Sequence, residues 1–139
     1  SLMFYTKYMG MTVVKEKHFN DFSLYFLATV EPGETEEMLG NPILELTHNH
    51  GTELDPDFKH FTGNEEGRKG FGHLGFLVDD VYEKCKELEE SGYRMKKKPD
   101  AGTMKGLAFA LDPDGYWIEI IKRGGYDTIG TPYFLEDSK

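Results

Sequence analysis

The chain has 139 residues, 38% hydrophobic and 29% charged, which is ordinary for a globular protein of one compact domain or two small modules. Its formal net charge of −9 argues against nucleic acid or an anionic membrane as the main partner. The single cysteine, Cys85, excludes a framework of intrachain disulfides and favours a reducing compartment, the cytoplasm. No apolar run approaches the roughly 18 residues of a membrane span, so no membrane partner is expected.

The first part of the chain predicts a short helix followed by three strands. Apolar residues at helical spacing place the helix at Leu2–Met9, and Gly10 ends it. An acidic loop, Glu31–Gly40, separates the second strand from the third. The three strands are expected at Met11–Lys15, Phe22–Ala28 and Ile43–His48.

The second part predicts a strand, a helix and three further strands. A polar connector, Gly51–Gly70, leads to the strand His73–Val78. The clearest helix of the chain follows at Val81–Glu90, and Asp80 and Glu83 have the spacing of a capping box at its start. The last strands are expected at Tyr93–Lys97, Leu107–Leu111 and Tyr116–Lys122, with the turn Asp112-Pro113-Asp114-Gly115 joining the final two.

These elements form an internal repeat, which predicts an α+β fold of two βαβββ modules, the first lacking its leading strand. The predicted parts are an incomplete first module (1–50), a connector (51–70), a second module (71–123) and a C-terminal tail (124–139). The second copy begins with a strand, whereas the first begins with its helix because the chain starts at Ser1. We therefore expect the sequence to be cut short at its N-terminus, with the counterpart of His73 about nine residues upstream.

Each copy carries a carboxylate in the middle of an apolar strand, Glu45 in the first and Glu119 in the second. An unpartnered ionised carboxylate is costly to bury, so such a group normally shifts its pKa, pairs with a cation or binds a metal. Strand alternation directs Glu45, His73 and Glu119 to one side of three strands. Because an imidazole and two carboxylates suit Zn²⁺, Ni²⁺, Fe²⁺ or Mn²⁺, the pattern predicts a divalent-metal site.

Simpler interpretations exist for single residues. A lone Glu in a strand is usually half-exposed on an edge, and His73 alone would be a hydrogen-bonded core histidine. His48 and His50 flank Asn49 as in an HNH nuclease, but the acidic charge balance argues against that function. The stretch Gly70–Gly75 matches GxGxxG, but it leads into a strand instead of opening a helix, which excludes dinucleotide binding.

Five stretches carry a family resemblance: FYTKYMGM (Phe4–Met11), FSLYFLA (Phe22–Ala28), LELTHNHGTE (Leu44–Glu53), GFGHLGF (Gly70–Phe76) and KKPDAGTMKGLAFALDPDGYWIEI (Lys97–Ile120). Together they resemble the glyoxalase I (lactoylglutathione lyase) family of the vicinal-oxygen-chelate superfamily. The resemblance extends from Ser1 to about Arg123. It implies paired βαβββ modules and a homodimer, because the family's site forms between a first and a second module, often from different subunits.

The resemblance also implies how a metal would be held. In that family four side chains bind the metal: each module supplies one from its first strand and one from its last strand. Three of them match Glu45, His73 and Glu119, and the fourth, a Gln or His, would fall upstream of Ser1. The acidic loop and long connector resemble the longer zinc-using enzymes, so Zn²⁺ is favoured, with Ni²⁺ as the alternative.

The implied reaction is the isomerisation of the hemithioacetal of methylglyoxal and glutathione to S-lactoylglutathione, a detoxification step on a small-molecule substrate. Glu119 matches the family's principal base, and Glu45 would be a ligand and a second proton shuttle. The residues matched to glutathione binding are Asn49, Arg68, Lys69, Lys97 and Met104, and those matched to the apolar pocket around the reacting carbons are Leu24 and Phe26.

Two alternatives to an active enzyme of this kind stay open. The chain could be a catalytically impaired protein that keeps the fold and the binding of metal or glutathione. It could also be another enzyme of the superfamily, such as an extradiol dioxygenase or a glutathione-dependent resistance enzyme. Extradiol dioxygenases usually present two His and one Glu, so Glu45 argues against them.

Overall fold

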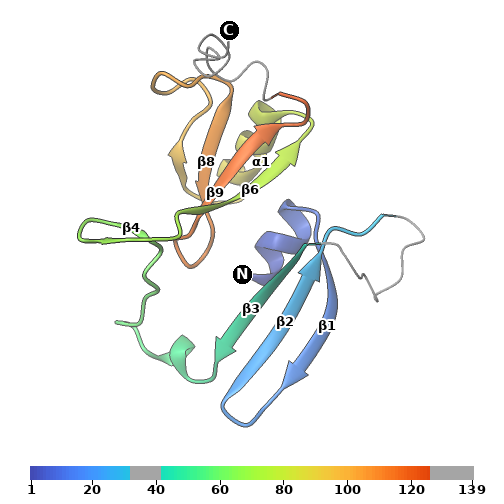
Figure 1. Cartoon of the computed structure of the whole chain (residues 1–139), viewed down its shortest axis with the longest axis vertical. Coiled ribbons are helices and arrows are strands. Elements are labelled where there is room, and N and C mark those ends of the chain that lie inside the picture. The colour runs from blue at the N-terminus through green and yellow to red at the C-terminus, as the bar shows by residue number, and fades with distance from the viewer. Residues whose placement is uncertain (32–41, 126–139) are drawn as a thin grey trace, which may run out of the picture. The chain divides into compact units, whose positions relative to one another are not determined.

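The computed structural model describes residues 1–31 and 42–125. These residues belong to two compact units, unit 1 (Ser1–Lys59) and unit 2 (His60–Lys139), which are drawn in Figure 1. The predicted acidic loop and C-terminal tail lie almost wholly outside the described residues. Within the described residues, no helix is long and apolar enough to cross a membrane.

Unit 1 is a short helix followed by an antiparallel sheet. The helical turn η1 (Phe4–Tyr8) ends before Gly10, whose φ of 72° reverses the chain direction. The three strands pair in the order β1-β2-β3. Their bounds are Thr12–His18 for β1, Phe22–Ala28 for β2 and Ile43–Asn49 for β3. The sequence prediction of a helix and three strands is therefore confirmed, with β1 three residues longer at its end.

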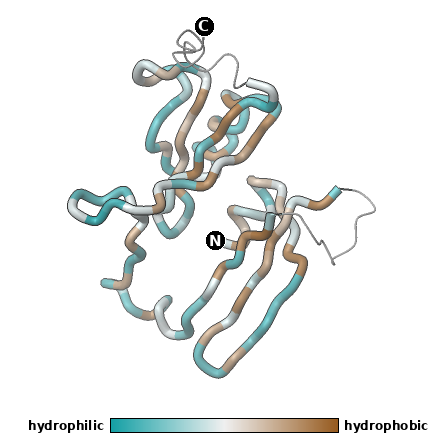
Figure 2. The backbone as a smooth tube through the Cα atoms, viewed as in Figure 1, coloured by the Kyte–Doolittle hydropathy of each residue, from teal (hydrophilic) through white to brown (hydrophobic). Residues whose placement is uncertain are grey.

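Alternation along β3 sorts its side chains as the sequence predicted. Glu45, Thr47 and Asn49 are exposed, whereas Leu44 and Leu46 are half-buried. Because successive residues of a strand point to opposite faces, the polar side chains share one face of the sheet. Figure 2 shows hydrophobic colour along much of β2, whereas the second half of β1 is hydrophilic.

Unit 2 contains a complete βαβββ module. A small hairpin precedes it, and its four-stranded sheet has the order β6-β9-β8-β7, with β6 parallel to β9 and the other pairs antiparallel. The elements are β4 (Asn64–Glu65), β5 (Arg68–Lys69), β6 (His73–Val78), α1 (Val81–Glu90), β7 (Met95–Lys97), β8 (Leu107–Leu111) and β9 (Trp117–Lys122). The predicted helix and the strands β6 and β8 have the bounds expected from the sequence.

The core of unit 2 lies between α1 and the sheet. The helix buries Val81, Cys85 and Leu88 and contacts β8 and β9. Ile118 and Ile120 of β9 are fully buried. Burial raises the pKa of the Cys85 thiol to about 11, so this side chain is a protonated core residue and a poor nucleophile. Ile118 and Ile120 thus face the core, and Glu119 between them lies on the other face.

The two units repeat the same sheet geometry. In unit 1, Lys15 pairs with Phe26 and Phe26 pairs with Glu45 across β1, β2 and β3. In unit 2, the equivalent row across β7, β8 and β9 is Lys97, Phe109 and Glu119. A bulge displaces the register before the lysine in both units. The structure therefore confirms the repeat down to the pairing of individual residues.

The connector contains structure that the sequence did not indicate. A helical turn, η2 (Thr52–Leu54), follows β3, and β4 and β5 form a hairpin. The hairpin turn contains Gly67 with a φ of 77°. Its strands are only two residues long and wholly polar, so they lack the apolar alternation by which a strand is recognised.

The cap of α1 gives a test of the fold. The Asp80 carboxylate accepts hydrogen bonds from the backbone N–H groups of Tyr82 (2.8 Å) and Glu83 (3.0 Å). We predict that Asp80→Ala lowers the free energy of unfolding by about 1 kcal/mol, because two N–H groups lose their acceptor. The matched control is Asp79→Ala, which removes only an exposed ion pair with Arg123. Urea denaturation that finds equal losses for the two variants would contradict this role of Asp80.

Candidate metal centre

His73 and Glu119 meet on the face of the unit 2 sheet that α1 does not cover. Their Nε2 and Oε2 atoms lie 3.2 Å apart, with 44% of the His73 side chain and 20% of the Glu119 side chain exposed. The parallel pairing of β6 with β9 brings them together, since it aligns His73 with Trp117 and Gly75 with Glu119. Alternation then places His73 and Glu119 on the same face.

Gly75 leaves room beside the carboxylate. A Cβ atom at Gly75 would lie 3.7 Å from Oε2 of Glu119, so a longer side chain would occupy the space next to this oxygen. Glycine inside a strand often marks a place where another group approaches closely. The register therefore keeps one side of the Glu119 carboxylate accessible.

An aromatic wall flanks the pair, and the sequence reasoning missed it. The ring of Phe109 contacts the His73 imidazole edge to face, with centroids 5.3 Å apart. The Trp117 ring follows at 5.6 Å from Phe109, and Nζ of Lys96 lies 5.2 Å from the Trp117 centroid. The hairpin between Leu107–Leu111 and the last strand was predicted from its turn, so its register could have indicated Phe109.

The pair fits a divalent cation. A neutral imidazole nitrogen and a carboxylate oxygen are both ligand atoms for such cations. Two ligand atoms at the usual zinc distances of about 2.0–2.1 Å lie roughly 3.3 Å apart in a tetrahedral arrangement. The observed 3.2 Å matches this separation. Neither unit by itself completes a metal site, since the described residues contain no group of three or more such side chains placed to hold an ion.

The predicted residues of unit 1 share the face of its sheet that carries Glu45. Phe26 pairs with Glu45, and Leu24 pairs with Thr47 two residues along. Asn49, at the end of β3, pairs with Phe22 and is exposed. Glu45 belongs to unit 1 whereas His73 and Glu119 belong to unit 2. The convergence of the three side chains on one cation therefore stays a prediction.

Backbone carbonyl oxygens after Lys97 accept hydrogen bonds from its side chain. Its ammonium donates to the carbonyl oxygens of Met104 (2.8 Å) and Leu107 (2.7 Å), with Lys98 further away at 3.4 Å. Burial, followed by the charge of Lys105, lowers the pKa of Lys97. The Met104 side chain is half-exposed on the same loop. The structure thus brings these two predicted residues together through the Met104 backbone.

Arg68 and Lys69, the two connector residues matched to glutathione binding, lie in the β5 strand of the hairpin and are exposed. The Arg68 guanidinium lies over the Phe61 ring, 4.1 Å from its centroid. Such stacking orients the guanidinium while its N–H groups can still reach an anion. Lys69 pairs with Asn64 in the hairpin ladder.

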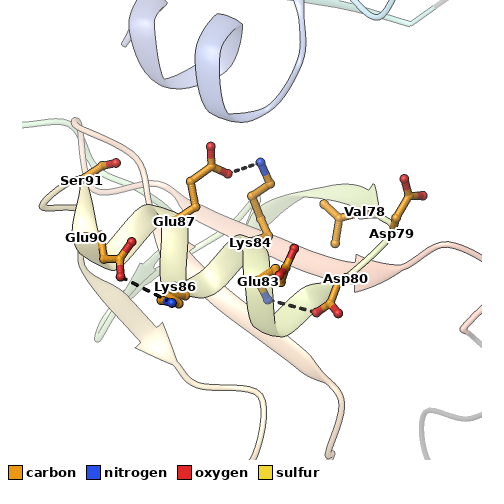
Figure 3. A pocket seen from close by; sticks show the side chains of 9 residues that line it. All are labelled: Val78, Asp79, Asp80, Glu83, Lys84, Lys86, Glu87, Glu90 and Ser91. Atoms are coloured by element: carbon orange, nitrogen blue, oxygen red, sulfur yellow. Dashed lines mark hydrogen bonds and ion pairs between the residues drawn. The ribbon is translucent and has the colours of Figure 1, made fainter.

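A separate hollow of about 500 Å³ lies along the exposed side of α1 (Figure 3). Charged side chains line it, and several pair with each other, including Lys84 with Glu87 and Lys86 with Glu90. None of the predicted site residues is among its lining residues. We interpret this hollow as the solvated face of a surface helix and not as a site.

The fold and the pair together define a class of protein: an α+β protein of repeated βαβββ type that carries ligand-type side chains on an open sheet face. The sequence profile of the Glyoxalase/Bleomycin resistance protein/Dioxygenase superfamily matches residues 1–120. The chain is 45% identical over 130 residues to glyoxalase I of Saccharomyces cerevisiae, covering 87% of this chain and 40% of the yeast protein. It is 44% identical to the lactoylglutathione lyase of Pseudomonas putida, covering 88% of this chain and 76% of that relative.

A solved structure gives the same result. The trypanothione-dependent glyoxalase I of Leishmania major superposes with a TM-score of 0.64 at 30% identity, covering 88% of this chain and 76% of that one. The chain therefore belongs to the glyoxalase/bleomycin resistance protein/dioxygenase superfamily, and the predicted α+β fold is confirmed. It spans less than half the length of the yeast relative.

The His73–Glu119 pair can be tested by its affinity for Zn²⁺. We predict that His73→Gln weakens Zn²⁺ binding at least tenfold, because removal even of groups that only support metal ligands commonly costs tenfold to a hundredfold. His60→Gln is the matched control, since His60 is an exposed histidine of the same unit, 3.9 Å from Asp114. Calorimetric titration that finds the same affinity for wild type and His73→Gln would contradict the assignment.

Proposed function

We propose that this chain carries the active-site machinery of a lactoylglutathione lyase. The reaction is the isomerisation of the hemithioacetal of methylglyoxal and glutathione to S-lactoylglutathione. The observation that carries the proposal is the contact of His73 with Glu119, 3.2 Å apart on the open sheet face. Relatives named glyoxalase I and lactoylglutathione lyase, at 45% and 44% identity, support this choice of reaction within the superfamily.

Glu119 is proposed as the base that moves the proton. The reaction takes a proton from one carbon of the substrate and returns it to the neighbouring carbon, so a single carboxylate beside both carbons can do both steps. Glu119 is part-exposed, and Gly75 leaves space next to its Oε2 atom. Phe109 lies opposite Glu119 in the neighbouring strand and contacts Trp117, so aromatic rings flank the carboxylate.

A divalent cation is proposed to be held by His73, Glu119 and Glu45. When bound, it would act as a Lewis acid that stabilises negative charge developing on the substrate oxygens. Glu45 has the same place in unit 1 that Glu119 has in unit 2, each opposite a phenylalanine of the neighbouring strand. This equivalence supports Glu45 as a ligand and as a second proton shuttle. We favour Zn²⁺ over Ni²⁺, and elemental analysis that finds nickel without zinc would reverse the choice.

The anionic groups of glutathione are proposed to meet cationic and amide side chains of both units. Arg68 presents a stacked guanidinium, Lys69 an exposed ammonium and Asn49 an exposed amide. Lys97 has three N–H donors, and three carbonyl oxygens lie within reach of them. It would release at least one of these carbonyls when it binds a carboxylate.

Apolar contacts and assembly complete the proposal. Leu24 and Phe26, on the face that carries Glu45, would contact the reacting carbons of the substrate. We propose a homodimer, in which the two halves of the site can come from different subunits, and sedimentation analysis would test it. The single cysteine supports a location in the cytoplasm, which fractionation of cells would test.

The proposal is tested by turnover of the hemithioacetal. We predict that Glu119→Gln lowers kcat by a factor of about 10² to 10⁴, because an amide cannot accept the substrate proton. Glu90→Gln is the control, since Glu90 is an exposed helix residue paired with Lys86. A spectrophotometric assay of S-lactoylglutathione formation gives both values. No turnover by the Zn²⁺-loaded or Ni²⁺-loaded wild-type chain, or full turnover by Glu119→Gln, would overturn the proposal.

A further inference from the structure

A serine buried between two imidazoles lies in unit 1, on residues that the proposed reaction does not use. The Ser23 hydroxyl is 3.0 Å from Nδ1 of His18 and 2.8 Å from Nε2 of His50, and only 3% of Ser23 is exposed. The three residues come from β1, from β2 and from the turn after β3. Ser23 pairs with His48 of β3, which places it on the face opposite Glu45 and Asn49.

In each imidazole, one ring nitrogen (the inner one) faces Ser23 and the other (the outer one) faces a different partner. Nε2 of His18 lies 3.2 Å from Oε2 of Glu16, and Nδ1 of His50 lies 3.2 Å from the carbonyl oxygen of Asn20. A carboxylate and a carbonyl can only accept hydrogen bonds. Both outer nitrogens therefore carry hydrogens, and the two inner nitrogens both face the Ser23 oxygen.

Ser23 has one hydrogen, so it can donate to only one of the two inner nitrogens. The other nitrogen must donate to Ser23, and its ring then carries hydrogens on both nitrogens. If both rings were neutral, one inner nitrogen would have no hydrogen to donate, and its lone pair would face a lone pair of the serine oxygen. If both were charged, two cations would flank one buried oxygen and the hydroxyl hydrogen would lose its acceptor. The contacts are all satisfied when the two rings share one positive charge.

His18, which contacts a carboxylate, is the ring better placed to hold that charge. The Glu16 carboxylate contacts His18 directly, whereas His50 has a neutral carbonyl as its outer partner. The Tyr25 ring stands edge-on to His18, with centroids 5.9 Å apart. The His48 ring stands edge-on to His50 at 5.4 Å, and His48 donates to the Glu53 carboxylate at 2.8 Å. The chain of hydrogen bonds then runs from charged His18 through Ser23 to neutral His50.

We propose that the hydrogen-bonded chain Glu16–His18–Ser23–His50, with one shared positive charge, positions the end of β3 and therefore the Asn49 amide for substrate. His50 follows Asn49 directly, and its backbone N–H donates to the carbonyl oxygen of Asp21 at 2.9 Å. The side chain and backbone of His50 thus both tie this end of β3 to the β1–β2 turn. These residues are positioning residues, and their role rests on the proposed function of Asn49.

The protonation pattern is tested by nuclear magnetic resonance of the histidine ring nitrogens in the full chain. The proposal expects hydrogens on both nitrogens of His18 and, on His50, a hydrogen on Nδ1 alone. In Ser23→Ala the hydrogen on Nδ1 of His18 is lost because its acceptor is gone, whereas His60→Gln removes only the His60 signals and leaves both patterns unchanged. Two neutral rings, or two charged rings, in the wild-type chain would overturn the shared charge.

The positioning role is tested by the kinetics of the same variants. Ser23→Ala should raise KM for the hemithioacetal about threefold to tenfold with little change in kcat, because Asn49 would bind glutathione and not the reacting carbons. Ser23→Thr keeps the hydroxyl and should restore KM, and His50→Gln gives a second variant if Ser23→Ala does not fold. An unchanged KM, or an equal loss of kcat, would overturn the role. Absence of turnover in the wild-type chain would overturn the proposed function and the positioning role together, whereas the ring spectra alone decide the shared charge.

Discussion

Strand alternation in β9 is the constraint on which the rest of this structure depends. Ile118 and Ile120 are fully buried on the side covered by α1, and Glu119, between them, is therefore directed to the opposite face. A shift of one residue in register would put the carboxylate into the core, where an unpartnered charge is very costly. The apolar packing of the helix thus fixes the position of the polar pair.

The same constraint explains what could be predicted from the sequence. The bounds of β6, α1 and β8 and the sidedness of Glu45 follow from local periodicity, which the chain displays directly. The wall formed by Phe109 depends on register between strands, and the carbonyl contacts of Lys97 depend on the path of a loop. No local pattern identifies the partners of Lys97, so its contacts could not be predicted, whereas the predicted turn before β9 sets the register that puts Phe109 opposite Glu119.

The hydrogen-bonded chain at Ser23 likewise could not be predicted from local sequence patterns. His48 and His50 stand out in the sequence, and their spacing alone suggested a nuclease motif that the acidic charge argued against. The partners of His50 in this chain, His18 and Ser23, are about thirty residues away and are brought in by the pairing of β1, β2 and β3. The two faces of this sheet therefore have different proposed tasks. One face carries Glu45 for metal binding and Asn49 for substrate binding, and the other holds the end of β3 in place.

The equivalent rows Lys15–Phe26–Glu45 and Lys97–Phe109–Glu119 indicate that both units present a carboxylate in the same way. The central claim is that Glu45, Glu119 and His73 bind one cation. The most direct test is a crystal structure of the metal-loaded protein with anomalous data collected at the zinc and nickel absorption edges. We expect one anomalous peak within bonding distance of Glu45, His73 and Glu119, from one chain or from two. A peak bound elsewhere, or a peak on His73 and Glu119 with Glu45 remote from it in every assembly, would contradict the claim.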